Sequence, residues 1–274
     1  MAGRTPIASD DLPARLIKPH TREKLDRHAQ YCGIFNGGMR NAWPDNRGYL
    51  ELFAGPGRLI EGGEELDGCP LIAAASSPAF TKLAFVEWKP TLAAALDHRL
   101  REKGLGEDRA LVVAGDANDP KVLGQAMDFL PVPGLIFCFI DPEAINGHWD
   151  AIDFLASRRW PERQRVDFLV NVPIGPMKRN YQQDAAISRV LGTDAWIERV
   201  AIGEPLGLVF RETLAAQFKG IGYQCAEHMV IRAGGTNAPV YELVFANHDP
   251  RGVDFWRKIA AVTPSGQRTL DLDV

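Results

Sequence analysis

The alternation of apolar and polar segments along the chain predicts a layered α/β protein. Short apolar runs alternate with segments of helical periodicity from residue 49 onward. These runs are apolar almost throughout, rather than at every second residue, which is typical of parallel strands buried on both faces. Right-handed helical crossovers between them give a doubly wound sheet. The expected strands are Tyr49 to Ala54, Lys82 to Glu87, Ala110 to Ala114, Leu135 to Ile140 and Val166 to Val172.

The last third of the chain predicts a different ending for the sheet. A helix from Leu206 to Gly220 precedes two strand-like runs, Ala226 to Arg232 and Val240 to Ala246. The residues Gly234-Gly235-Thr236-Asn237 between them favour a hairpin turn. Five parallel strands closed by an antiparallel hairpin are the usual order of class I S-adenosylmethionine-dependent methyltransferases, so we expect that Rossmann-like α/β fold. Helices are expected between the strands at Pro70 to Ser77, Leu92 to Lys103, Pro120 to Leu130 (capped by Asp119) and Trp149 to Trp160.

Ahead of the first strand, the sequence predicts an extension. Residues 1–19 are polar and contain prolines, which favours a loose arm. A helix from His20 to Phe35 follows, with Thr21 as its cap, and Gly37 is expected to end it. We therefore divide the chain into an N-terminal arm and helix, residues 1–47, and a methyltransferase-like Rossmann domain, residues 48–274.

Composition narrows the class of protein. The chain has 274 residues, with 31 Lys and Arg against 35 Asp and Glu, for a net charge of -4. This balance lowers the expectation that nucleic acid is held by phosphate neutralisation alone, although a local basic patch can suffice. The four cysteines lack metal or redox spacing, which suits a reducing cytoplasm. Because the sequence has no signal-like or membrane-length apolar run, we expect a cytoplasmic protein that does not bind a membrane.

The turn after the first expected strand is the strongest candidate for a cofactor site. Ligands of open α/β sheets bind beyond the carboxyl ends of the strands, where glycine lets the backbone approach them closely. An NAD fingerprint needs a third glycine or alanine where Ile60 stands, and an acid nearer than Glu87. The remaining alternative is an ordinary strand turn. The candidate cofactor residues here are Glu51, Phe53, Ala54, Gly55, Pro56 and Gly57.

The next two strand ends supply further cofactor candidates. Glu87 can accept hydrogen bonds from two ribose hydroxyls, and the neighbouring Trp88 can cover an adenine ring. Asp116, followed by Ala117, can accept a hydrogen bond from the adenine amino group. The alternatives are solvated acids, a packing tryptophan and a helix cap. Because Asp119 is already placed to cap the helix, Asp116 is left for the ligand.

The fourth strand end carries the candidate reaction site. In amino-methylating enzymes an Asp/Asn-Pro-Pro-aromatic segment here holds the target amine beside the methyl group, and alignment is the main catalytic device. This chain has Asp141 and Pro142 without the second proline or the aromatic, and Glu143 is an additional acid that can take a proton. Asn171, at the end of the fifth strand, is expected to line the same pocket. The alternative is a Pro-containing loop with solvated acids.

Other features carry weaker signals. No His, Cys, Asp or Glu grouping has metal-ligand spacing, so we expect no metal site. A lone histidine, His148, is more often structural than catalytic. Two basic clusters, Arg158 to Arg165 and Lys178-Arg179, are able to meet phosphates or acidic groups, and the second is placed to overhang the pocket.

Taken together, these motifs resemble the three-Cys-motif partner (TcmP) protein family over roughly residues 20–250. The resemblance implies a methyltransferase-like Rossmann fold, a bacterial or archaeal setting and a partner protein with a three-cysteine, radical-enzyme-like motif. It departs at Glu143-Ala144-Ile145, where Phe-Gly is expected after Asp-Pro. The matching stretches are His20-Thr21-Arg22-Glu23-Lys24, Leu52 to Gly57, Cys69 to Ala73, Phe85-Val86-Glu87, Gly115 to Asn118 and Phe139 to Pro142.

Three functions follow as hypotheses. The first is methyl transfer from S-adenosylmethionine to an unidentified acceptor, a nucleic acid or a modified peptide. The second is a non-catalytic methyltransferase-like subunit that supports a three-Cys-motif partner. The third is a Mg²⁺-dependent nucleic-acid processing enzyme that uses Asp116, Asp141 and Glu143, since carboxylate oxygens suit that ion.

Overall fold

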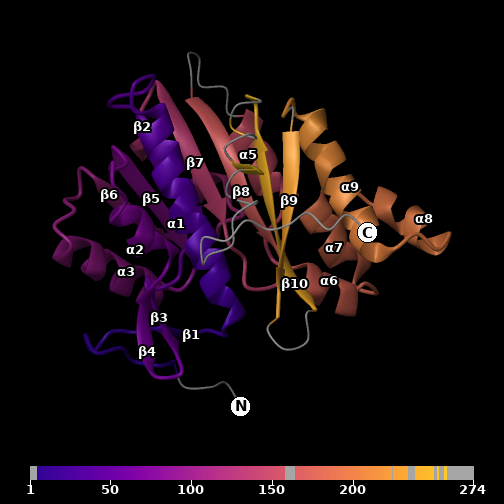
Figure 1. Ribbon diagram of the computed structural model, residues 1–274, viewed down its shortest axis with the longest axis horizontal. Helices are drawn as coiled ribbons and strands as arrows, with labels where there is room; N and C mark the ends of the chain where they lie inside the picture. The colour runs from indigo at the N-terminus through magenta and orange to yellow at the C-terminus, as the bar shows by residue number, and fades with distance from the viewer. Residues whose placement is uncertain are drawn as a thin grey trace.

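A twisted seven-stranded sheet forms the centre of the computed structural model (Figure 1). The structure describes residues 5–157, 164–223, 225–233, 238–249, 252 and 256–257. The strands lie in the order β6-β5-β2-β7-β8-β10-β9, with β2 in the middle of the parallel part. Their bounds are β2 Arg47–Leu52, β5 Lys82–Glu87, β6 Ala110–Ala114, β7 Gly134–Ile140, β8 Gln164–Val172, β9 Cys225–Arg232 and β10 Pro239–Asn247.

The pairing of these strands confirms the expected fold class. Strands β6, β5, β2, β7 and β8 run parallel, whereas β10 is antiparallel to both β8 and β9. The structure therefore has the five parallel strands and the closing antiparallel hairpin of the class I methyltransferase fold. Strands β5 and β6 have the bounds that the apolar pattern predicts, and the other strands differ from their predicted bounds by one or two residues.

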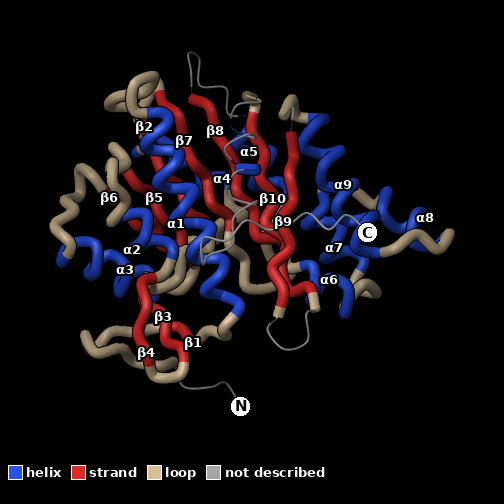
Figure 2. The backbone as a smooth tube through the Cα atoms, in the orientation of Figure 1, coloured by secondary structure: helices blue, strands red, loops and turns tan. Residues whose placement is uncertain are grey.

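Helices cover both faces of the sheet (Figure 2). On the face towards the viewer in Figure 1, α1, α2 and α3 pack on the strands. The opposite face is covered by α4, α5, α7, α8 and α9. Their bounds are α1 His20–Met39, α2 Cys69–Ala74, α3 Pro90–Glu102, α4 Pro120–Phe129, α5 Trp149–Ser157, α6 Ile174–Arg179, α7 Asp184–Leu191, α8 Ala195–Ala201 and α9 Leu206–Gly220. As predicted, Asp119 caps α4, accepting from the Lys121 amide at 2.8 Å.

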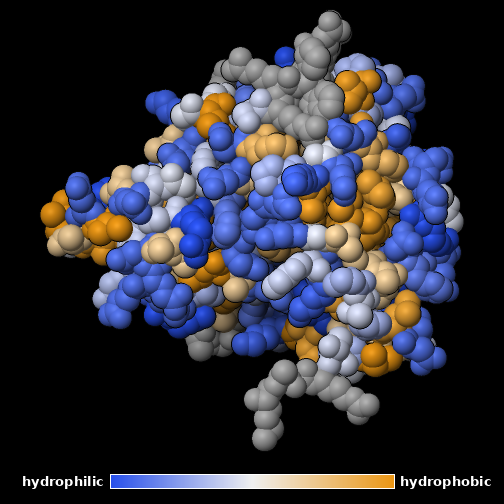
Figure 3. Space-filling view, turned by 180° about the vertical axis from the view of Figure 1, so that it is seen from behind, coloured by the Kyte–Doolittle hydropathy of each residue, from blue (hydrophilic) through white to orange (hydrophobic). Residues whose placement is uncertain are grey.

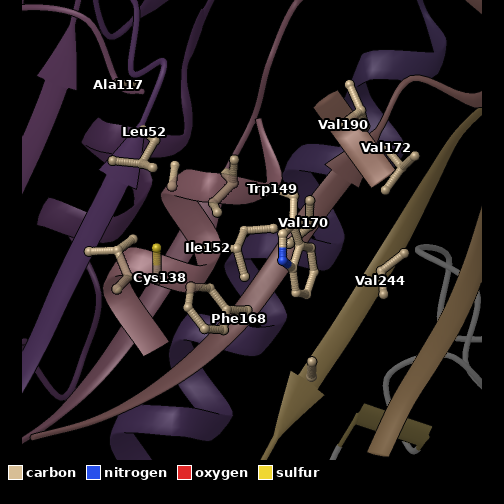
Figure 4. Close-up of a cluster of buried hydrophobic side chains, with 14 of the residues drawn as sticks. Leu52, Ala117, Cys138, Trp149, Ile152, Phe168, Val170, Val172, Val190 and Val244 are labelled. Atoms are coloured by element: carbon tan, nitrogen blue, oxygen red, sulfur yellow. The ribbon is translucent and has the colours of Figure 1, made fainter. Parts of the chain in front are cut away.

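Alternate residues of each strand face opposite hydrophobic clusters, as strand geometry requires. In β2, Leu50 and Leu52 face one cluster and Tyr49 faces the other. Figure 4 shows the first cluster, where Trp149 and Phe168 are buried; Trp149 packs edge-on against Phe218. Seen from behind, the surface is mixed: hydrophilic residues predominate, and apolar groups gather at the projecting end that carries α8 and right of the centre of the view (Figure 3). Because both faces of the central strands are covered, their continuous apolar character is explained.

The N-terminal segment is not the loose arm that its composition predicts. From residue 5 on it packs against the domain: Ala8 and Ala14 are buried, and β1 (Arg15–Leu16) pairs with β3. The Gly-rich stretch after β2 is also more ordered than expected, because it forms a hairpin of β3 (Arg58–Glu61) and β4 (Glu64–Asp67). Gly62 and Gly63, with φ of +58° and +92°, make its turn, the conformation that glycine permits.

A buried arginine ties this segment to the glycine turn. Arg99 of α3 donates two hydrogen bonds to Asp10, at 2.7 and 2.8 Å, and one to the Pro13 carbonyl at 2.8 Å. The same guanidinium donates to the Pro56 carbonyl at 2.6 Å. The pair with Arg99 lowers the pKa of Asp10 to about 2. These contacts hold the N-terminal segment in one position beside the turn that follows β2.

Helix α1 differs from its prediction at both ends. It begins after Pro19 without a side-chain cap, so Thr21 does not cap it, and it continues through Gly37 to Met39. The continuation is stabilised by tertiary contacts, since buried Asn36 accepts a hydrogen bond at 3.2 Å from Arg47 of β2. Helices α6, α7 and α8 have no counterpart in the predicted elements. Two stretches with sequence predictions lie outside the described residues. Residues 158–163 contain the end of a predicted helix and part of a basic cluster, and residues 234–237 contain the predicted hairpin turn. Across the described part of the chain, no helix has the length and apolar character of a membrane span.

Candidate functional site

A cavity of about 320 Å³ lies at the carboxyl ends of the central strands. Its walls come from the turn after β2, the ends of β7 and β8, the start of α1, and β1. The volume is at the lower end of the range for small-molecule sites. Because helix α1 and strand β1 both belong to the N-terminal extension, the extension forms part of the site.

The turn after β2 has an unusual backbone. Phe53, Gly55 and Gly57 have φ values of +64°, +66° and +78°. A positive φ is uncommon for a phenylalanine, and strained residues of this kind cluster at functional sites. A Cβ added to Gly55 would lie 3.3 Å from the Arg15 guanidinium, so glycine leaves the space between the turn and β1 open. The turn therefore combines backbone strain with close access from the cavity.

Glu87, at the end of β5, fixes this turn. One carboxylate oxygen accepts a hydrogen bond from the Gly55 amide at 2.8 Å, and the other accepts from the Lys89 amide at 2.9 Å. Glu87 is buried, and each oxygen keeps a second lone pair. The contact with Gly55 links the ends of β2 and β5 directly.

The structure brings together most, but not all, of the residues that the sequence singles out. Along the cavity lie Glu51, Phe53, Ala54, Gly55, Pro56, Gly57, Asp141, Pro142, Glu143 and Asn171. Glu87, Trp88, Asp116 and Ala117 lie beyond its walls, at the ends of β5 and β6. Trp88 is 73% exposed, and Asp116 accepts bonds from the amide and side chain of Asn118. The predicted adenosine side therefore lies outside this cavity, with Glu87 and Ala117 buried and Trp88 and Asp116 exposed, and the cavity covers the predicted methyl-transfer side.

Asp141 is held from two sides. Its Oδ2 accepts a hydrogen bond from Lys24 Nζ at 2.5 Å, and its Oδ1 accepts from Asn171 Nδ2 at 2.7 Å. The Lys24 side chain is only 10% exposed. Burial alone would lower the pKa of Lys24, but the charge and hydrogen bond of Asp141 more than offset it and raise that pKa. The pair is therefore a fixed ion pair at neutral pH.

Asn171 leaves one polar atom without a partner. Its Oδ1 is buried and has no hydrogen bond. The orientation of the amide is fixed, because exchanging Oδ1 and Nδ2 would set an oxygen against the Asp141 carboxylate. An unsatisfied buried acceptor of this kind is costly and calls for a partner such as a ligand donor or water.

Two charged residues of the N-terminal extension, Arg15 and Lys24, line the cavity but were not predicted as site residues. Arg15 Nε pairs with Glu143 at 2.8 Å across the cavity, and Lys24 pairs with Asp141. The motif His20-Thr21-Arg22-Glu23-Lys24 was a signal for Lys24, although it did not reveal the partner. Arg15 had no signal, since its role depends on how β1 folds over the turn.

Beneath the cavity, a chain of buried polar groups runs towards α1. Tyr49 donates a hydrogen bond to Glu51 at 2.6 Å, and its hydroxyl lies 2.8 Å from His28 Nε2. Burial raises the pKa of Glu51 well above its usual range, against the opposing effect of the Tyr49 bond. Burial also lowers the pKa of His28 to about 3. His28 is therefore uncharged at neutral pH, and the shift of Glu51 favours its uncharged form.

The raised pKa of Glu51 predicts that the stability of the protein depends on pH. A carboxyl group whose pKa is raised by folding contributes stability below its unfolded pKa, and that contribution is lost as the pH rises through the folded value. Glu51→Gln removes the ionisation and keeps the acceptor for Tyr49. Denaturant unfolding is expected to show that the variant is more stable than the wild type at pH 8, with a gap that closes towards pH 4. A stability difference between the two proteins that does not change from pH 4 to pH 8 would contradict a raised pKa for Glu51.

The strand-end acids are poorly arranged for a metal ion. The carboxylates of Asp141 and Glu143 already pair with Lys24 and Arg15. Among the described residues, no group of three His, Cys, Asp or Glu side chains is placed to hold a metal. Two of the three carboxylates that the Mg²⁺ hypothesis uses are therefore engaged in ion pairs.

Comparisons with known proteins place the chain beside methyltransferase structures at low similarity. No protein-family model matches the sequence, and no curated protein matches it. TYW2 from M. jannaschii, solved in complex with AdoMet, has 13% sequence identity and a TM-score of 0.42, over 84% of this chain and 76% of that chain. The N-methyltransferase NodS from Bradyrhizobium japonicum WM9 has 9% identity and a TM-score of 0.43, over 85% and 98%.

Cofactor-bound Rv0187 from MTB is similar to the same degree, with 16% identity and a TM-score of 0.43, over 85% of this chain and 91% of that chain. Values this low give no ground for transferring an activity or a ligand from these proteins. The assignment of a function therefore rests on the geometry of the site.

Proposed function

We propose that the protein is an S-adenosylmethionine-dependent methyltransferase that acts on a nucleic-acid or modified-peptide acceptor. The observation that carries this proposal is the strained, Gly-rich turn after the central strand, fixed by Glu87 and opening onto a cavity whose far wall is Asp141. In an open α/β sheet this is the place where a ligand binds. The proposal joins a cofactor side at β2, β5 and β6 to an acceptor side at β7 and β8.

The residues present fit such a cofactor. Gly55 and Gly57 keep the turn free of side chains, and the second lone pairs of Glu87 are available to ribose hydroxyls. Trp88 offers an exposed ring beside them. When bound, S-adenosylmethionine supplies an electrophilic methyl group on a sulfonium.

On the acceptor side, this chain positions the nucleophile. Effective alignment of two reacting groups contributes a large part of the rate of an in-line displacement. Asn171 Oδ1, which lacks a partner, is available to accept a hydrogen bond from the acceptor. Asp141 is bonded to Lys24 and Asn171, so its role in this structure is to position Asn171. It contacts the acceptor directly only if an acceptor amine displaces Lys24.

The same ion pair supports a second candidate function. Because Lys24 and Asn171 each donate to one Asp141 oxygen, an acceptor amine has to compete with the Lys24 ammonium for this carboxylate. This favours the alternative of a non-catalytic methyltransferase-like subunit of a three-Cys-motif partner protein. Three buried free thiols, Cys32, Cys69 and Cys138, suit the reducing cytoplasm that we propose as the setting of either function.

Labelling with methyl-labelled S-adenosylmethionine separates the two candidates. The protein is incubated with and without its genomic neighbour, and label is followed in nucleic-acid, peptide and small-molecule fractions. Label transferred by this chain to one fraction supports the enzyme. Cofactor binding without transfer, together with stable association with the neighbour, supports the subunit.

Glu87 gives a more specific prediction for the cofactor. Glu87→Ala removes the acceptor for the Gly55 amide and for the ribose hydroxyls, and each charge-assisted bond contributes about 1.5–3 kcal/mol. Calorimetry is expected to show S-adenosylmethionine binding weakened by at least about tenfold. The exposed Glu107→Ala is the control for charge removal. An unchanged dissociation constant in folded Glu87→Ala would mean that Glu87 stabilises the turn and does not bind the cofactor.

A further inference from the structure

Around the cavity, the charges do not balance once the ion pairs are taken into account. Arg15 pairs with Glu143, and Lys24 pairs with Asp141. Glu51 accepts a hydrogen bond from Tyr49, and burial raises its pKa, which favours its uncharged form. Lys18 and Arg179 also line the cavity, and neither has an acidic partner among the described residues. The cavity lining therefore has two cations without an acidic partner among the described residues, although the whole chain has a net charge of -4.

These two cations come from different parts of the fold. Lys18 precedes α1, and Arg179 is the last residue of α6, the helix that follows β8. Both side chains are exposed, so a ligand at the mouth of the cavity can contact them. A guanidinium can bind two phosphate oxygens at once, and a lysine ammonium adds a point charge.

Aromatic rings line the cavity together with these cations. The rings of His20 and Tyr241 lie 5.4 Å apart, and both residues line the cavity. Burial lowers the pKa of His20, and the charges of Lys18 and Lys24 lower it further. His20 is therefore neutral at pH 7 in a locally positive environment. A neutral ring pair near cations suits the base or sugar that is attached to a phosphate.

We propose that the acceptor is a nucleoside phosphate, and that Lys18 and Arg179 bind its phosphate at the mouth of the cavity. This inference rests on the proposed function, because it assigns the acceptor of the same site. The phosphate can belong to a free nucleotide or to a nucleic-acid chain. The local excess of positive charge supplies the patch that an acidic protein needs for such a ligand.

Uridine probes test this assignment, because they lack the adenine of the cofactor. Binding of uridine, uridine 5′-monophosphate and a fluorescent ten-nucleotide oligouridine is measured at two or more salt concentrations. The wild type is compared with Lys18→Ala/Arg179→Ala and with the control Lys121→Ala/Lys219→Ala, which removes two exposed lysines that lie outside the cavity lining.

The expected result is phosphate-dependent binding that the first double variant weakens at least tenfold and the control leaves within twofold. For the oligonucleotide, loss of two phosphate contacts is expected to reduce the slope of log affinity against log salt by about 1.4. Binding of the monophosphate identifies a free nucleotide as sufficient, and binding of the oligonucleotide alone identifies a nucleic-acid chain. Either result supports the proposal.

The proposal is overturned if wild-type protein binds none of the phosphate probes, if uridine binds as tightly as its phosphate, or if both double variants behave alike. Calorimetry with S-adenosylmethionine on the same proteins keeps the two proposals apart. Retained cofactor affinity in Lys18→Ala/Arg179→Ala places both cations on the acceptor. Phosphate binding without any cofactor binding would reject the methyltransferase and leave the phosphate site.

Discussion

Lys24→Met is expected to lower the free energy of unfolding by about 2–3 kcal/mol, because it removes the charged donor of a partly buried carboxylate. The substitution keeps an unbranched side chain but leaves the Asp141 carboxylate with a single donor, Asn171. Denaturant unfolding at neutral pH measures the change. Lys103→Met is the matched control, because Lys103 pairs with Asp67 where both side chains are about a third exposed. Exposed pairs of this kind contribute at most about 1 kcal/mol.

The double variant Lys24→Met/Asp141→Asn tests whether the effect belongs to the pair. Removing both charges leaves no buried ion without a partner, so the two losses are expected not to add. A coupling energy on the order of 2–3 kcal/mol is expected from the double-mutant cycle. Additive losses would mean that Lys24 stabilises α1 by packing, and that Asp141 is free to hold an acceptor.

Gly57→Ala is expected to destabilise the turn by roughly 2–5 kcal/mol, the sum of backbone strain and overpacking. Gly57 has φ +78°, and an added Cβ would lie 2.8 Å from Leu96 Cδ1 and 3.1 Å from Leu71 Cγ. Both leucines are fully buried, so they cannot move aside without disturbing the core. Denaturant unfolding measures the loss.

Gly62→Ala separates the two causes. Gly62 also has a positive φ, +58°, but no atom lies within 4 Å of its added Cβ. Only the backbone cost of about 1–2 kcal/mol is expected there. Equal losses for the two variants would contradict the close packing of the turn between α2 and α3.

The strands of the sheet were predictable because each one is marked by a short apolar run in its own sequence. The interior of β5 and the whole of β6 are apolar, since helices cover the sheet, and the bounds of both strands agree with the predicted ones. The hairpin of β3 and β4 was missed because its residues, such as Glu64 and Glu65, are mostly charged and lie at the surface. The signal that remained was the Gly62-Gly63 pair, which is typical of a tight hairpin turn.

The candidate site was predictable at the strand ends and not in the N-terminal extension. Topology brings the ends of parallel strands to one edge, so Gly55 and Asp141 were expected to lie near each other, and both line the cavity. Lys24 meets Asp141 across 117 residues of sequence, and no local pattern encodes that contact. The same holds for Arg99 of α3, which binds Asp10 across 89 residues of sequence.

Calorimetric titration with S-adenosylmethionine and with NAD tests the central proposal most directly. The geometry of the turn predicts that S-adenosylmethionine or its demethylated product binds and that NAD does not, since Ile60 replaces the third glycine or alanine of an NAD fingerprint. Affinity for NAD equal to or better than that for S-adenosylmethionine would contradict the assignment of this site.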